Sequence, residues 1–171
     1  MTRPARALAI PLPTSRPLAP ATADALAAGV FAGAVGASLF ALFFLVLDLL
    51  RGEALATPAL VGAVVLQGAS ALQWAPVDLG IVGAYSLVHA FLFASFATLA
   101  SLALVRMRTI PDLPVLALAL VLALGLEGGF LVTTGLLAPG LGATIGHGVV
   151  LAGNAVAGIT MAVILRRELA L

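Results

Sequence analysis

The stretch that decides the fold lies between two prolines and a Pro-Gly pair: PDLPVLALALVLALGLEGGFLVTTGLLAPG, residues 111–140. Between the prolines the run is apolar except for Glu127 and a pair of threonines. A helix of about 25 residues crosses a hydrocarbon core of about 30 Å. Because proline removes a backbone donor and ends helices, the run is bounded at both sides. We therefore expect a spanning helix over about 113–137.

The composition extends this expectation to the whole chain. Its 171 residues are 63% hydrophobic and only 9% charged, whereas soluble domains are about 45–50% apolar and about 25% charged. Such an excess, spread along the sequence, does not fit one soluble core. Three further apolar runs have spanning length, at about 24–50, 79–105 and 141–165. The predicted fold class is an all-α integral membrane four-helix bundle, with one domain over 24–171.

A shorter apolar segment lies between the first two spans, at about 58–72. Thr57 is a suitable cap for its start and Pro58 suits the first helical turn. The segment is too short to cross the bilayer comfortably, so we expect an interfacial or re-entrant helix. Asp24 and Asp78 are the expected caps of the first and second spans.

The charges predict the orientation. Residues 1–23 hold five prolines and three arginines but no acid, which favours a disordered tail. With four spans, seven of the eight arginines fall on one side of the membrane and only Arg51 on the other. By the positive-inside rule both termini are expected in the cytoplasm. All basic residues are arginine, which is typical of a GC-rich bacterial genome and suggests a bacterial inner membrane.

The sequence argues against several classes of function. No basic patch exists outside the helix ends, so we expect no nucleic acid partner. Cysteine is absent, which removes disulfides and thiolate chemistry. No serine elbow, phosphate-binding glycine loop or metalloprotease helix is present. We therefore do not expect the protein to be an enzyme. The expected partner is the lipid bilayer; the motif Gly142–Gly146 also permits a homo-oligomer or a place in a membrane complex.

Three ionisable residues lie inside the apolar runs: His89, Glu127 and His147. Counted at 1.5 Å per residue from the cytoplasmic helix ends, they lie roughly 25, 24 and 28 Å up, in the outer half of the bilayer. Such groups are costly in lipid and usually mark a pathway, a ligand site or an interhelical contact. Two histidines and a carboxylate also suit iron, copper, zinc or haem. These three are therefore the candidate metal ligands, although no metal-binding motif accompanies them.

Other polar residues extend this set. Tyr85 shares a helix face with His89, and Asn154 follows His147 by seven residues. Asp48 lies near the outer end of the first span, where Arg51 can reach it. The glycines around Glu127, at 125, 128 and 129, leave room for a neighbouring helix or a ligand. Together Asp48, Tyr85 and Asn154 form the predicted polar cluster.

Two interpretations of these residues are open. The favoured one is plain interhelical hydrogen bonding in a structural or accessory membrane component. The alternative is a transporter-like or redox-associated protein, in which Glu127 carries a proton or binds as an anionic ligand and the histidines relay or ligate.

Three segments carry a resemblance: LVLDLLRGEALATPALVG (45–62), YSLVHAFLFASFATLASLAL (85–104) and GNAVAGITMAVILRRE (153–168). Over about residues 25–168 the chain resembles a recurrent type of small four-helix bacterial integral membrane protein. The most distinctive elements are Asp-Leu-Leu-x-Gly with Thr57-Pro58, then His89, then Gly153-Asn154. The resemblance implies the four-span architecture and no activity.

Overall fold

The computed structural model describes residues 22–73, 76–107 and 114–169, all of whose regular structure is helical. The predicted tail (1–23) lies almost wholly outside these ranges, as does the proline-rich start of the third span. The elements, in chain order, are α1 (Thr22–Leu50), α2 (Ala56–Gln67), the 3-10 helix η1 (Ala69–Gln73), α3 (Leu79–Arg106), α4 (Val115–Leu137), α5 (Leu141–Ile145) and α6 (His147–Glu168).

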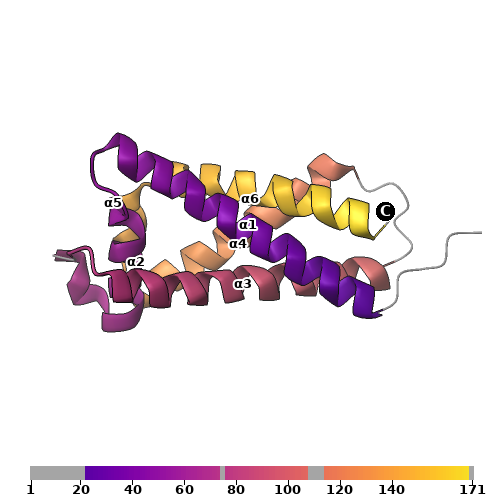
Figure 1. Cartoon of the computed structure of the whole chain (residues 1–171), viewed down its shortest axis with the longest axis horizontal. Coiled ribbons are helices and arrows are strands. Elements are labelled where there is room, and N and C mark those ends of the chain that lie inside the picture. The colour runs from indigo at the N-terminus through magenta and orange to yellow at the C-terminus, as the bar shows by residue number, and fades with distance from the viewer. Residues whose placement is uncertain (1–21, 74–75, 108–113, 170–171) are drawn as a thin grey trace, which may run out of the picture.

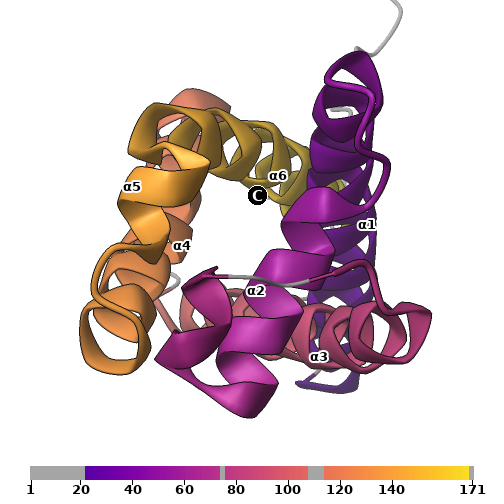
Figure 2. The same cartoon turned by 90° about the vertical axis from the view of Figure 1, so that its left-hand side faces the viewer.

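The four long helices α1, α3, α4 and α6 run along one axis as a bundle (Figure 1). The short helices α2 and α5 lie together at one end, and the end of α6 lies at the other. Helix α1 packs against α3 and α6, and α4 packs against α6, whereas extensive contact between α3 and α4 is absent from the described residues. Figure 2 shows the resulting ring, with α2 beside α3 and on the side facing α4 and α5. The predicted bundle with a short helix between the first two spans is confirmed.

Glycines allow α1 to approach its neighbours closely. A side chain at Gly29 or Gly33 would overlap the backbone of α3, at Thr98 and at Ala94 respectively. A side chain at Gly36 would instead meet Met161 of α6. Without a strong hydrophobic force between helices in lipid, close van der Waals packing of this kind stabilises the bundle. The α1–α3 contact also includes a buried hydrogen bond of 2.7 Å from Ser101 Oγ to the carbonyl oxygen of Ala25.

The predicted fourth span differs from the structure. Instead of one helix over 141–165, α5 ends at Ile145 and α6 begins at His147. The break is at Gly146, whose φ of 94° and ψ of 110° lie outside the helical region. Glycine adopts such a backbone without the Cβ clash that other residues suffer. The motif Gly142–Gly146 thus includes the point where the helix is interrupted, and it is not only a stripe of small residues for helix packing.

The short helix also differs in detail from its prediction. Helix α2 spans Ala56–Gln67, and Gly68 separates it from η1. Thr57 does not cap its own helix, because α2 already begins at Ala56. Asp78, in contrast, caps α3 as predicted, with Oδ1 accepting from the backbone N of Gly80 at 2.7 Å and of Ile81 at 3.1 Å. Asp24 lies within the first turn of α1, after its start at Thr22.

Candidate functional site

Glu127 and Asn154 form an interhelical pair. Asn154 Nδ2, on α6, donates to Glu127 Oε2, on α4, at 2.8 Å. Asn154 is buried, and the α4–α6 contact is close at this level because Gly158, one turn further on, lies against the backbone of Ala119 and Ala123. An amide that donates to a carboxylate gives both groups a partner where water is absent.

His147 lies in a different environment. It is the first residue of α6 and is exposed. Its ring meets Phe130 of α4 edge-on, with ring centroids 6.3 Å apart. Gly142 of α5 makes room for the imidazole, since a side chain at that position would overlap the ring.

His89 lies on α3 among aromatic rings. Its centroid is 4.4 Å from that of Phe93, 5.0 Å from that of Phe40 and 5.7 Å from that of Tyr85. The backbone of Ala37, on α1, also lies within hydrogen-bonding reach of the imidazole. Nevertheless, Nε2 is buried and has no hydrogen-bond partner in the part of the chain that the structure describes. Such an atom needs an explanation, because leaving a buried polar atom without a partner is costly.

The structure therefore gives the three candidate metal ligands separate surroundings. Glu127 bonds to Asn154, His147 packs on Phe130, and His89 packs on Phe40 and Phe93. Within residues 22–73, 76–107 and 114–169, no group of three or more His, Cys, Asp or Glu side chains is arranged to hold a metal ion.

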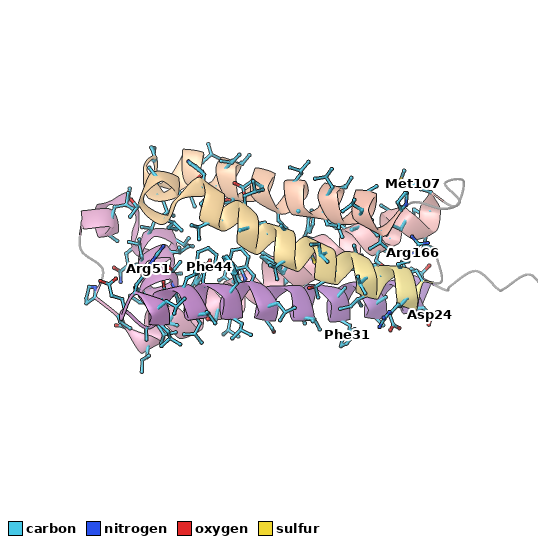
Figure 3. All side chains as sticks on the ribbon, turned by 90° about the horizontal axis from the view of Figure 1, so that it is seen from above. Asp24, Phe31, Phe44, Arg51, Met107 and Arg166 are labelled. Carbon is cyan, nitrogen blue, oxygen red and sulfur yellow. The ribbon has the colours of Figure 1, made fainter. Side chains whose placement is uncertain are left out.

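Asp48 bonds to α2 rather than to the neighbouring Arg51. It is only 1% exposed, and its two carboxylate oxygens accept from the backbone N of Thr57 at 2.8 Å and from Thr57 Oγ1 at 2.7 Å. Arg51 is exposed at the bundle end that holds α2, opposite the end of Asp24 and Arg166 (Figure 3). Thr57 was predicted to cap α2 with its own side chain. Instead, its backbone N and its hydroxyl both donate to the carboxylate of Asp48 on α1.

A cavity runs through the bundle beneath α2. Its first part, the α1 lobe, has a volume of about 540 Å³ and lies between α1, α2 and α3. Its second part, the α4 lobe, has a volume of about 320 Å³ and extends from α3 toward α4. Both lobes are lined by the same six residues at their junction: Phe40, Val61, Tyr85, His89, Phe130 and Val150. These volumes are typical of small-molecule sites.

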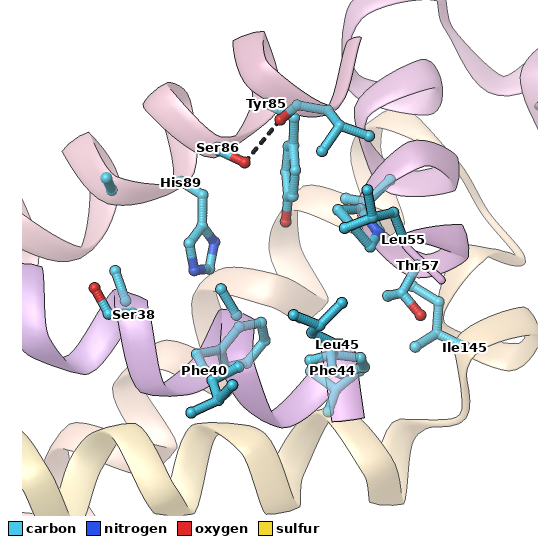
Figure 4. Close-up of a pocket in the computed structure, with 18 of the residues that line it drawn as sticks. Ser38, Phe40, Phe44, Leu45, Leu55, Thr57, Tyr85, Ser86, His89 and Ile145 are labelled. Atoms are coloured by element: carbon cyan, nitrogen blue, oxygen red, sulfur yellow. Dashed lines mark hydrogen bonds between the residues drawn. The ribbon is translucent and has the colours of Figure 1, made fainter. Parts of the chain in front are cut away.

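Most polar groups in the cavity wall already have partners. The hydroxyls of Ser38, Ser86 and Thr134 donate to carbonyl oxygens of their own helices. Thr57 is bonded to Asp48 and Asn154 to Glu127. Tyr85 and His89 differ, since no hydrogen bond among the described residues involves the Tyr85 hydroxyl or His89 Nε2. Figure 4 shows both side chains projecting from α3 toward α1, into the pocket.

The sequence indicated only part of this site. The spacing of Tyr85 and His89 placed them on one face, and they do lie together. The aromatic walls were missed, because Phe40, Phe93 and Phe130 look in the sequence like ordinary lipid-facing or core residues. Their contribution follows from how α1 and α4 are placed around α3, which the sequence pattern does not specify.

No protein-family model, curated protein or solved structure matches the chain. Its class therefore rests on its own features. The described residues contain four helices long and apolar enough to cross a membrane: α1, α3, α4 and α6. Large apolar side chains cover their outer faces; Leu87, Phe91 and Leu136 are 75%, 70% and 78% exposed. A surface of this kind suits lipid rather than water. The chain is a polytopic membrane protein.

Proposed function

We propose that this protein is an accessory membrane component that binds a lipid-soluble small molecule in the cavity below α2. The observation that carries the proposal is the two-lobed cavity itself, whose volumes of about 540 and 320 Å³ lie between the helices and are partly open to the surroundings. Since an empty apolar space of this size forfeits packing contacts, an occupant would restore them.

The lining agrees with an occupant from the bilayer. No arginine, lysine, aspartate or glutamate lines either lobe in the described ranges. The wall is made largely of alanine, valine, leucine and phenylalanine side chains. An ion or a sugar would lose its hydration here without compensation. An apolar molecule would not.

The proposal includes an orientation. Arg106 and Arg166 end α3 and α6, at the bundle end opposite Arg51. If the arginine-rich end is cytoplasmic, α2 and the nearby cavity lie in the outer half of a bacterial inner membrane. The ligand would then be drawn from the outer leaflet.

Photolabelling in membranes tests this function. A long-chain aliphatic probe with a diazirine group is added to membranes that contain the protein, and labelled residues are mapped by mass spectrometry. We expect labels at cavity residues such as Phe40 and Phe130 in addition to the lipid-facing Leu87. Labels restricted to lipid-facing residues would contradict the proposal.

The transporter-like or redox-associated alternative is weaker on this structure. It needs His89, Glu127 and His147 to act together, whereas each has a different direct partner: Phe93 for His89, Asn154 for Glu127 and Phe130 for His147. Glu127→Gln is the matching test, because the amide oxygen still accepts from Asn154 while the carboxylate is gone. Loss of proton flux with normal protein abundance would favour the alternative.

A further inference from the structure

The junction of the two lobes has a composition of its own. It brings the hydroxyl of Tyr85 and the imidazole of His89 together with the rings of Phe40 and Phe130. Phe93 and Phe96 continue the aromatic wall into the α4 lobe. Flat rings packed at offset or tilted angles gain energy beyond the area that they bury. The junction therefore suits a flat ring better than a flexible chain.

The depth and charge of the junction limit the ligand further. His89 lies ten residues after the start of α3 at Leu79, roughly 15 Å into the membrane from that end. No cationic side chain lines the cavity in the described residues. An anionic carboxylate or phosphate at this depth would be unpaired, which is costly. A phospholipid head group or a fatty acid is thereby disfavoured, and a neutral molecule is favoured.

The polar atoms define what this neutral molecule must carry. The Tyr85 hydroxyl is both donor and acceptor, and a neutral His89, whose imidazole already meets the backbone of Ala37, offers its other nitrogen as a donor or an acceptor according to the tautomer. Carbonyl and hydroxyl oxygens attached to a ring match these two groups. The hydroxyls of Ser38, Ser86 and Thr134 are already bonded within their own helices, as Ser86 Oγ is to the carbonyl oxygen of Val82 at 2.7 Å.

We propose that the cavity binds a neutral ring-bearing lipid of the quinone or hydroquinone class, with its ring oxygens at Tyr85 and His89. This inference rests on the proposed function and names its ligand class. The ring lies between Phe40 and Phe130, and the apolar tail follows the α4 lobe. No electron transfer is required of the protein, which only binds.

The α4 lobe also provides the path for the tail. Its walls are Val88 and Leu92 of α3 and Gly125 and Gly129 of α4, two helices without extensive contact. A side chain at Gly129 would meet nothing within 4 Å, so the space beside it is open. A molecule from the bilayer can enter laterally between α3 and α4 without unfolding either helix.

The test uses the full chain in lipid nanodiscs and a radiolabelled 1,4-naphthoquinone with a short prenyl tail. Specific binding is measured by competition with the unlabelled compound. Tyr85→Phe keeps the ring and removes only the hydroxyl, and we expect it to weaken binding about tenfold, as is typical for the loss of one hydrogen bond. His89→Leu should weaken it at least as much. Thr160→Ala, on α6 and outside both lobes, should leave the affinity unchanged.

A second pair of variants tests the path. Gly129→Leu fills the α4 lobe, whereas Gly128→Leu adds the same side chain at a neighbouring position that does not line the cavity. We expect the first to abolish binding and the second to preserve it. Both replacements also favour the helix, so neither should impair folding.

The outcomes separate this inference from the proposed function. Cavity labelling by the aliphatic probe without quinone binding would overturn the ligand class and leave the function intact. Failure of both probes would overturn both. Equal quinone affinity in wild type, Tyr85→Phe and His89→Leu would also overturn the placement of the oxygens.

Discussion

Asp48 at the end of α1 holds Thr57 at the start of α2 through two hydrogen bonds, of 2.8 Å from the Thr57 backbone N and 2.7 Å from its Oγ1. The bond spans nine residues of chain, and the carboxylate is almost fully buried. Since Thr57 and Pro58 also line the α1 lobe, this pair fixes the position of the helix that covers the cavity.

Thr57→Val should destabilise the protein by about 1–2 kcal/mol, because one oxygen of a buried carboxylate loses its donor while the side chain keeps its shape. Thermal unfolding in detergent measures the effect. Thr160→Val is the matched control: its hydroxyl donates only to the carbonyl oxygen of Val156 in its own helix. An equal loss in both variants would show that the Asp48 contact contributes nothing.

Asn154→Ala should destabilise the α4–α6 contact by about 0.5–2 kcal/mol, the range measured for interhelical hydrogen bonds in membranes. Glu127→Gln should cost less, because its amide oxygen still accepts from Asn154 Nδ2. A double-mutant cycle with Asn154→Ala and Glu127→Leu isolates the coupling. Strictly additive effects of the two single changes would contradict a direct pair.

Gly33→Leu should prevent the close α1–α3 contact, since even its Cβ would overlap the backbone at Ala94. We expect a loss of several kcal/mol or failure to accumulate, beyond the about 1–3 kcal/mol typical of an overpacked core. Gly135→Leu, with nothing within 4 Å of its Cβ position, is the control. Yield and monodispersity in detergent are the readouts, and equal behaviour of the two variants would refute the contact.

Gly146→Ala should destabilise by about 1–3 kcal/mol, because φ of 94° is strained for any residue with a Cβ. Gly148→Ala, two residues on and inside α6, has open space and should be neutral or slightly stabilising. Melting temperatures of the two variants decide the matter. If Gly146→Ala were as stable as the control, the interruption of the helix between α5 and α6 would be refuted.

The absence of cysteine in the chain makes its orientation easy to test. A single cysteine introduced as Ala54→Cys, in the exposed segment after α1, should react with a membrane-impermeant maleimide added outside intact cells. Arg167→Cys, at the other end of the bundle, should react only after the membrane is opened. The reverse pattern would place both termini outside.

The sequence predicted the class and the number of long helices because these depend on local hydrophobicity and length. The close packing at Gly29 and Gly33 has a similarly local cause, since small residues four apart let two helices approach. The partners of polar groups depend on helix rotation and neighbours, so they were harder to predict. Asp48 has Arg51 three residues away, yet its partner is Thr57.

The sequence predicted a shared membrane depth for His89, Glu127 and His147, but depth alone does not determine which residues they contact. Depth fixes one coordinate, whereas contact also requires the correct helix face. Glu127 lies toward α6 and His89 toward α1, so both meet residues of other helices instead of each other. The break at Gly146 was missed because a glycine pair spaced by four residues reads equally well as helix packing.

The pairing of the long helices has a consequence for how the protein is made. Helix α1 packs on α3 and α4 packs on α6, so each half of the chain brings its two long helices into contact with each other. A second contact, where Gly36 meets Met161 and Gly153 meets Phe40, joins α1 to the last span. That contact forms after translation has delivered α6 to the membrane. Because Val150 and Asn154 of α6 line the cavity, a nascent chain stalled before α6 lacks part of the cavity wall.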